Sequence, residues 1–370
     1  MKDLLNSYFK ENIERKVLPL NRAFIGLYSI LSCLSKKSNR KKVLYPPTTC
    51  ASPVYATTFA GLKPVFADVS LSDYLIDEKA TIRYIELYKD ELLAVVYIYI
   101  FGHTSDSVLR IKEVCDKYGI YLIEDVAQAF GSNVDGIPTG LIGHYSVFSF
   151  GYSKQVEVGI GGLFVNNMPT VVSNKEMQDF ISNIEFTQLT PEQSQQYKKD
   201  FYDFRLESIV DESKYIKYLD FPERFHDLYF TAKQPDWNKI SDKLRSFLDE
   251  DMLTKRNQNA KKYYEGFSCE SLKEYVYAPE LKDGYSIYRY TILLTSEENS
   301  LKFSDYLRNN GINCSNLYIP VNRFYGETDC PNALLYAKKC VNLWVDAGIA
   351  TDEYIEKTIE LTKQYFAHNE

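Results

Sequence analysis

Lys154 and Asp125 have residue types and surroundings that could support covalent chemistry in this 370-residue chain. Lys154 lies within FSFGYSKQVEVGIGG (148–162), among aromatic, small and glycine residues, whereas most lysines occur in charged stretches such as KKSNRKK. Asp125 directly follows YLIE, at the carboxyl end of an expected strand, where ligands gather in open α/β sheets. A lysine amine can form a Schiff base with the aldehyde of pyridoxal phosphate (PLP), whose ring nitrogen needs an anion. The pair therefore indicates PLP chemistry, although such an aspartate can also cap a helix and a lysine in a turn is often solvated.

Alternating strands and helices in the first half of the chain are expected to position these two residues. The run LLAVVYIYIF (92–101) is continuously apolar, as expected of a strand that is buried on both faces. In SVLRIKEVCDKYG, apolar residues recur at helical spacing, and Gly119 follows as the C-terminal cap. The other expected elements are helices at 22–34 and around 54–60, and strands within KKVLYPP, at 64–68 and at 121–123. This βαβ order predicts an α/β fold with a mostly parallel central sheet and helices on both faces.

The second half of the chain has a different character. Residues 169–260 are rich in charge and tyrosine, which predicts helices and long connections with few strands. From about residue 271 an α+β pattern returns. Its expected elements are a strand at 285–294, a helix at 300–311 capped by Gly311, and an amphipathic helix at 352–366. We therefore expect two domains, a large cofactor-binding domain at 1–235 and a small α+β domain at 236–370.

Charge and composition argue against several classes of protein. The net charge of −7 disfavours a nucleic-acid-binding protein, and the four histidines lack the spacing of a structural zinc site. The seven cysteines are scattered without a CxxC pair, which indicates reduced thiols in a cytoplasmic protein rather than a disulfide framework. The charged N-terminal residues are unlike a signal peptide, and the longest apolar run is about half the length that a bilayer-spanning helix needs. We therefore expect neither a metal nor a membrane association.

Several longer stretches resemble one protein family in their order and spacing. IEDVAQAFGS (123–132), GHYSVFSFGYSK (143–154) and GIGG (159–162) are similar to the motifs of the DegT/DnrJ/EryC1/StrS family of PLP-dependent nucleotide-sugar aminotransferases, which have fold type I. VLYPPTTC, GLKPVFADV and FGHTSD precede them in the family's order. The resemblance is clear over residues 17–167, weak as far as about 285, and returns in outline at RYTI, GINC and LYIP.

This resemblance implies roles for four residues of the two main motifs. Lys154 would hold PLP covalently and then move the proton between the substrate carbon and the cofactor. Asp125 would pair with the pyridinium nitrogen, and Gln128 would contact the side of the ring that carries the hydroxyl. Ser149 would donate its hydroxyl to the cofactor phosphate. Simpler roles exist for two of them, since Ser149 could be a turn hydroxyl and Gln128 a helix-surface amide. Gly161 and Gly162 are expected to serve a tight turn and a close backbone approach rather than to contact the ligand.

The sequence departs from the family pattern at several positions. Asn21 stands where the family commonly has glycine at the start of its first helix, whose backbone N–H groups hold the phosphate, and Arg22 is a further candidate for phosphate binding. Cys50 replaces the aromatic residue that often stacks on the cofactor ring. LYIPVN (317–322) stands in place of a segment that usually contains two histidines, and no GYNxR stretch is found. These departures concern mainly the substrate end of the site.

The family resemblance implies an aminotransferase. An amino acid, expected to be glutamate, would donate the amine, and a nucleotide-linked keto sugar would accept it, in the biosynthesis of cell-surface polysaccharide or of sugars for secondary metabolites. A homodimer with active sites at the subunit interface is expected. Two alternatives stay open: a PLP-dependent sugar dehydratase-like enzyme, and a PLP-binding regulator without turnover. Lys154 argues against the first, because histidine replaces this lysine in the deoxygenating branch.

Overall fold

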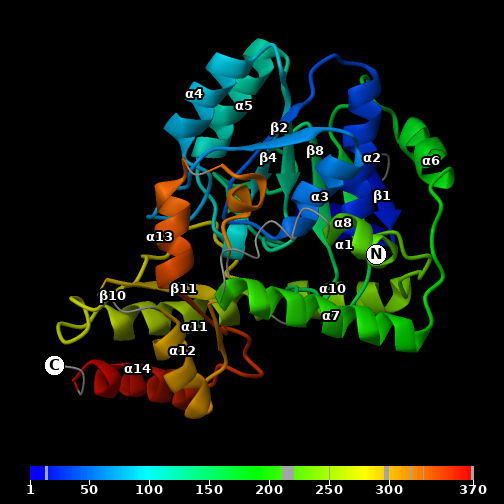
Figure 1. The fold of residues 1–370 in the computed structure, drawn as a ribbon. Coiled ribbons are helices and arrows are strands. Elements are labelled where there is room, and N and C mark those ends of the chain that lie inside the picture. Colours follow the sequence, from blue (N-terminus) through cyan, green and yellow to red (C-terminus); the bar gives the residue numbers. More distant parts are fainter. Residues whose placement is uncertain are drawn as a thin grey trace.

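A seven-stranded sheet lies at the centre of the larger part of the protein (Figure 1). The computed structural model describes residues 1–12, 16–210, 221–249, 251–295, 300–316, 319–327 and 329–367. In spatial order, the strands of the large sheet are β1 (Val17–Leu20), β9 (Gly162–Asn166), β8 (Tyr145–Ser149), β5 (Tyr121–Asp125), β4 (Leu92–Ile98), β2 (Lys42–Tyr45) and β3 (Lys63–Phe66).

Strands β8, β5, β4, β2 and β3 are parallel to one another, and β9 is antiparallel to both of its neighbours. The described connection between β8 and β9, residues 150–161, contains no helix. A connection without a crossover helix returns the chain antiparallel beside the strand that it leaves. The mostly parallel sheet predicted from the sequence is confirmed, and the reversed strand begins where the Lys154 segment ends.

Helices cover the large sheet and continue into the C-terminal part. Those of the first half are α1 (Lys2–Phe9), α2 (Ala23–Lys36), α3 (Ala51–Phe59), α4 (Glu78–Tyr88), α5 (Ser107–Tyr118) and α6 (Asn174–Ser182). The remaining ones are α7 (Pro191–Val210), α8 (Phe221–Arg224), α9 (His226–Tyr229), α10 (Trp237–Asp249), α11 (Met252–Phe267), α12 (Ser300–Asn309), α13 (Pro331–Lys339) and α14 (Asp352–Ala367). No strand lies in the described part of 169–260, in agreement with the helices and connections expected there.

Strand register shows that helices lie on both faces of the large sheet. Asp125 of β5 is paired with Val147 of β8, so both side chains lie on one face, and Gly26 of α2 lies against Val147. Tyr97 of β4 is paired with the residue before Asp125 and therefore points to the opposite face. There its hydroxyl lies 3.0 Å from the Ser107 hydroxyl at the start of α5. The face that carries Asp125 is thus the α2 face.

A second sheet of four antiparallel strands organises the C-terminal part. In spatial order its strands are β10 (Val276–Tyr277), β11 (Tyr290–Leu294), β13 (Cys340–Leu343) and β12 (Cys314–Ser315), and a separate hairpin consists of β6 (Asn133–Val134) and β7 (Ile137–Pro138). The apolar faces of α11, α12 and α14 form a hydrophobic cluster with this sheet, distinct from the cluster around the large sheet. Figure 1 shows these elements together at one end of the molecule. The α+β character predicted for this part is therefore present.

The strand predicted at 285–294 is wrong in its first half, because β11 begins only at Tyr290. Residues 285–289 use their backbone groups to contact the large sheet's loops. The Ser286 amide donates to the Gly102 carbonyl (3.0 Å) and the Tyr288 amide to the Phe101 carbonyl (2.7 Å). The run YSIYRYTILL looks like a strand throughout, but contacts with a distant segment compete for the backbone groups of its first half.

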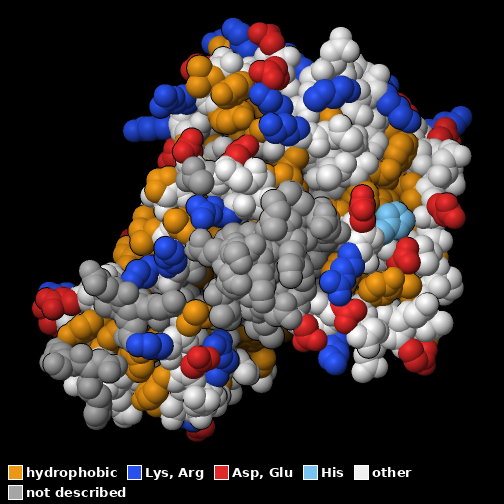
Figure 2. All heavy atoms as spheres, viewed as in Figure 1, with side chains coloured by type: hydrophobic (Ala, Val, Ile, Leu, Met, Phe, Trp, Pro, Cys, Tyr) orange, Lys and Arg blue, Asp and Glu red, His pale blue; other side chains and the backbone are white. Residues whose placement is uncertain are grey.

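Charges of both signs are interspersed on the face of the molecule in Figure 2. None of the described helices is both long and apolar enough to cross a bilayer. All seven cysteines are free, and Cys50 is exposed. Among the described residues, no group of three or more histidine, cysteine or acidic side chains is arranged to hold a metal ion.

Candidate active site

A cavity of about 600 Å³ lies at the carboxyl ends of β4, β5 and β8, on the α2 face of the large sheet. The N-terminal ends of α2 and α3 complete its wall. Six of the seven residues that the sequence predicted for the site line this cavity: Arg22, Cys50, Asp125, Gln128, Ser149 and Lys154. Residues far apart in the sequence therefore meet in one place, as the parallel sheet predicts.

Asp125 is the last residue of β5, and its side chain is 9% exposed. One carboxylate oxygen, Oδ1, accepts a hydrogen bond from the Ala127 amide (2.9 Å). No other described residue donates to this carboxylate, so Oδ2 is available to a ligand. Burial raises the pKa of Asp125, while the Ala127 amide and the positive charge of Lys154 oppose that shift. A cation placed against Oδ2 would therefore compensate a costly buried charge.

Lys154 lies in the connection between β8 and β9, beside the cavity. Its side chain is partly buried, and no hydrogen-bond or ion-pair partner of its amine is found among the described residues. Ser153 before it has a φ of 56°, a left-handed conformation that is unusual outside glycine. The loop thus holds an unpaired amine at the cavity that contains Asp125.

Arg22 and Ser149 line one corner of the cavity, at the start of α2. Arg22 is the N-cap of this helix, and its Nε atom is buried without a hydrogen-bond partner in the described structure. Burial lowers the pKa of this guanidinium, so an anion nearby would stabilise its charge. The Ser149 hydroxyl at the end of β8 accepts from the Gly151 amide (3.2 Å) and retains its own proton for a ligand. A helix start, a buried arginine and a hydroxyl together suit a phosphate group.

The two loop glycines allow this corner to form. Gly161 has a φ of 115°, and its amide donates to the Asn21 carbonyl (2.8 Å). A Cβ atom on Gly162 would lie 2.4 Å from the Ala23 backbone nitrogen. Both glycines therefore serve a turn and a close backbone approach, as predicted, although Gly161 also lines the cavity.

Asn21 is the predicted site residue that does not line the cavity. Its side-chain amide donates to the Thr231 carbonyl (2.7 Å), which ties the start of α2 to the segment after α9. Gln128 and Cys50, which do line the cavity, also have hydrogen-bond partners within the protein. The Gln128 Oε1 atom accepts from the Phe101 amide (2.9 Å), and the Cys50 sulfur accepts from the Ser52 amide at the start of α3 (3.5 Å). The ligand contacts predicted for these three residues stay predictions.

Further lining residues were missed by the sequence analysis. Tyr229 and Lys198 line the cavity from the segment at 169–260, where the sequence resembles the family only weakly. The Tyr229 ring is buried and stacks on Phe24 at a centroid distance of 4.7 Å. No sequence signal places these residues beside Lys154, because the chain returns to the site only through tertiary packing. In the LYIPVN segment, Leu317 and Tyr318 lie outside the described residues.

Gln155 is a further residue that the sequence analysis did not single out. Its Oε1 atom accepts from the Phe130 amide (2.9 Å), and its Nε2 atom donates to the carbonyl and hydroxyl oxygens of Ser286 (both 2.7 Å). The Ser286 hydroxyl in turn donates to the Phe130 carbonyl (2.6 Å). The residue next to Lys154 thus joins the loop after β5 to the segment before β11, which fixes the base of the Lys154 loop.

Replacing Gln155 by alanine is expected to destabilise the protein by about 1–3 kcal/mol, because the Phe130 amide and Ser286 lose their partners in a partly buried place. Urea unfolding followed by circular dichroism measures this loss. Gln234→Ala, at an exposed glutamine, is the matched control and should change little. Equal stability of both variants would show that the Gln155 contacts do not hold the loop.

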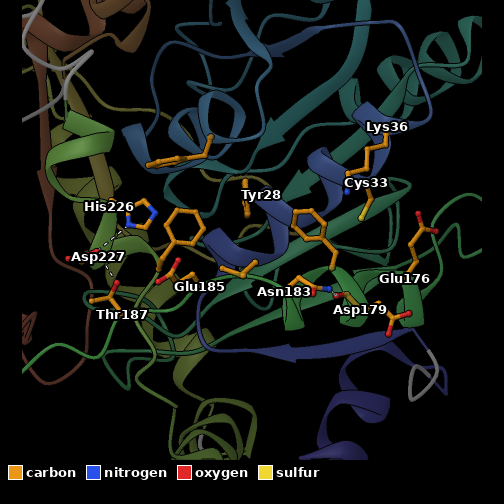
Figure 3. A pocket seen from close by; sticks show the side chains of 14 residues that line it. Tyr28, Cys33, Lys36, Glu176, Asp179, Asn183, Glu185, Thr187, His226 and Asp227 are labelled. Atoms are coloured by element: carbon orange, nitrogen blue, oxygen red, sulfur yellow. Dashed lines mark hydrogen bonds and ion pairs between the residues drawn. The ribbon is translucent and has the colours of Figure 1, made fainter.

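A second and larger cavity has a volume of about 850 Å³, and Figure 3 shows it from close by. Phe24 separates the two, since its ring contacts Tyr229 of the first cavity and Tyr28 and Phe230 of the second. Figure 3 shows acidic side chains, including Glu176 and Asp179, around it. It contains neither Lys154 nor Asp125, so the smaller cavity is the candidate active site.

Comparison with known proteins decides the family. The sequence profile of the DegT/DnrJ/EryC1/StrS aminotransferase family matches residues 14–209, which are 196 of the 370 residues of this chain. The chain belongs to this family. The match contains all seven predicted site residues of the DegT/DnrJ/EryC1/StrS motifs, and it ends within α7.

Individual members of the DegT/DnrJ/EryC1/StrS family are similar over shorter segments. GDP-perosamine synthase from Vibrio cholerae is 31% identical over 171 residues, which cover 46% of this chain and 45% of that protein. UDP-4-amino-4,6-dideoxy-N-acetyl-beta-L-altrosamine transaminase from Campylobacter jejuni is 30% identical over 154 residues, covering 42% and 40%. The chain therefore spans less than half of the length of these relatives at recognisable similarity.

Solved structures extend the likeness of fold over nearly the whole chain. The aminotransferase PseC from Helicobacter pylori, described as involved in the biosynthesis of pseudoaminic acid, superposes with a TM-score of 0.73 at 19% identity. The superposition covers 99% of this chain and 90% of that chain. The fold predicted from the DegT/DnrJ/EryC1/StrS resemblance, including its C-terminal part, is confirmed.

Proposed function

We propose that this chain is a PLP-dependent aminotransferase that moves an amine from an amino acid, glutamate in the first instance, to a nucleotide-linked keto sugar. The observation that carries the proposal is the meeting of Lys154, Asp125 and the Arg22–Ser149 corner around one cavity. These groups fit three parts of PLP: its aldehyde, its ring nitrogen, which takes a proton, and its phosphate, which anchors the cofactor. The buried, unpartnered Nε atom of Arg22 is the clearest support for anion binding at this corner.

When bound, PLP supplies a carbonyl that exchanges amines and a ring that accepts an electron pair. The chain's own residues then have separate tasks. Asp125 Oδ2 holds a proton at the ring nitrogen, and the Ala127 amide keeps the carboxylate in place from the other oxygen. Lys154 Nζ would hold the cofactor and move a proton between the substrate carbon and the cofactor. Ser149 and Arg22 orient the phosphate, while the apolar side chains of Ile98 and Ile100 exclude water from this end of the cavity.

The names of the relatives support a sugar as the amine acceptor. Both sequence relatives described above are, by name, enzymes of nucleotide-linked amino sugars, one GDP-linked and one UDP-linked. The cavity is also large enough for a substrate beyond the cofactor, at about 600 Å³. We further propose a cytoplasmic homodimer, and a domain boundary near residue 235, before α10.

Spectroscopy of the purified protein loaded with PLP tests the proposed function. Adding glutamate alone should convert the absorption band of the lysine-bound cofactor to that of the pyridoxamine form. A GDP-, UDP- or dTDP-linked keto sugar should then restore the first band, whereas the free keto sugar should do so poorly. The nucleotide contributes binding energy that positions the reacting carbon. Failure of every amino donor tried to convert the band would contradict the aminotransferase and favour a PLP-binding regulator.

A further inference from the structure

The candidate active site contains more positive charge than its carboxylates balance. Three cationic residues line the cavity, namely Arg22, Lys154 and Lys198. None of them has a carboxylate within ion-pair distance among the described residues, although the chain as a whole has a net charge of −7. Asp125, the acidic residue of the cavity wall, interacts with Lys154 only electrostatically, without an ion-pair contact. Such a concentration of unpaired cations predicts anionic ligands.

One phosphate accounts for only part of this charge. The phosphate of the cofactor would take Arg22, the Ser149 hydroxyl and the start of α2, and the amine of Lys154 would be used by the covalent link. Lys198 of α7 remains, and its amine donates to the hydroxyl of Tyr152, two residues before Lys154, while Lys233 acts on Tyr152 only electrostatically. Lys198, a lining cation without a carboxylate partner among the described residues, is therefore left over for a second anion.

Tyr152 is held in place at the entrance of the cavity. Its ring lies over Gly159, where a Cβ atom would come within 3.2 Å of the ring carbons, and its side chain is 54% exposed. The Lys198 amine donates to the Tyr152 hydroxyl oxygen (2.7 Å) and lies 3.9 Å from the ring centroid. This contact lowers the pKa of Tyr152 and leaves its hydroxyl proton free for an acceptor. A lysine and a tyrosine thus present donors side by side, between bulk water and the cofactor corner.

We propose that Lys198 and Tyr152 bind the diphosphate of the nucleotide-linked substrate. Charge-assisted hydrogen bonds from the ammonium and the phenol would hold two adjacent phosphate groups at the entrance, while the sugar reaches inward toward Lys154. Lys233 would add a weaker, solvent-screened attraction, because its side chain is exposed. This inference rests on the proposed function, since it assigns the part of that substrate which lies outside the reacting carbon.

Binding of GDP, UDP and dTDP to the PLP-loaded protein, measured by calorimetry, tests this assignment. At least one of these should bind the wild type more tightly than its nucleoside does, and Lys198→Ala should weaken it about 10- to 100-fold. Tyr152→Phe should weaken it less, and added salt should reduce the difference between wild type and Lys198→Ala. Lys199→Ala is the matched control, because Lys199 is exposed on the same helix and does not line the cavity.

One further measurement separates the possible sources of the phosphate. The affinity of Lys198→Ala for PLP should equal that of the wild type. A loss of PLP affinity comparable to the loss of nucleotide affinity would assign Lys198 to the cofactor phosphate and overturn the proposal. Equal nucleotide binding by wild type and Lys198→Ala, equal losses in Lys198→Ala and Lys199→Ala, or no nucleotide binding by the wild type would also overturn it. None of these outcomes depends on whether the amino donor converts the wild-type cofactor.

Discussion

Lys154→Ala should lose the absorption band of lysine-bound PLP and slow conversion by the amino donor by roughly 10⁴-fold or more, the scale seen when a covalent catalytic group is removed. The physical reason is the double task of Nζ, which would both hold the cofactor and move the proton. The structure supports this view, because the Lys154 amine reaches the cavity of Asp125 without an ion-pair partner among the described residues. Stopped-flow absorption with a single turnover of the donor measures the change.

Lys154→Arg is the matched control for the charge. Arginine keeps the positive charge near Asp125, but its guanidinium stays protonated and cannot act as the nucleophile. It should therefore be as inactive as the alanine variant, while its affinity for PLP decreases less. Borohydride reduction followed by peptide mass analysis should find the cofactor on Lys154 in the wild type and on no peptide of either variant. A labelled peptide elsewhere, or a wild-type rate in Lys154→Arg, would remove Lys154 from the mechanism.

Asp125→Asn should retain PLP and yet lose about 10²–10³ in the rate of conversion, by analogy with the loss of other preorganised electrostatic contacts. The asparagine side chain has the same shape and can still accept from the Ala127 amide through its oxygen. Its other end would then present an NH₂ group to the ring nitrogen, which could no longer be held protonated. The donor half-reaction, followed by absorption at saturating PLP, measures the effect.

Thermal unfolding of Asp125→Asn without PLP provides the control for structure. Burial raises the pKa of Asp125, so the carboxylate is costly in the free protein, and its replacement by a neutral amide should leave stability unchanged or raise it. A loss of activity with unaltered unfolding would place the defect in the chemistry. Conversion at nearly the wild-type rate would contradict the role of Asp125 at the ring nitrogen.

Much of the large sheet could be predicted from the sequence. The apolar run that became β4 is buried along its whole length, and Gly119 adopts the left-handed conformation expected of a helix cap, with a φ of 62°. These features depend on neighbours in the chain, so local patterns reveal them. The segment at 285–289 shows the limit of such patterns, because its backbone binds Phe101 and Gly102 rather than continuing β11.

The sequence alone predicted the family, the order of the elements and the reactive residues at or after the strand ends, including Asp125 and Lys154. Its motifs are local, and the parallel sheet converts their order into proximity at one edge. Only the tertiary structure showed that Gln155 joins two distant segments, that Asn21 bonds to Thr231 instead of lining the cavity, and that Lys198 reaches Tyr152. The physical reason is that each of these contacts joins residues tens to hundreds of positions apart. Such contacts depend on packing and leave no periodic signal in the chain.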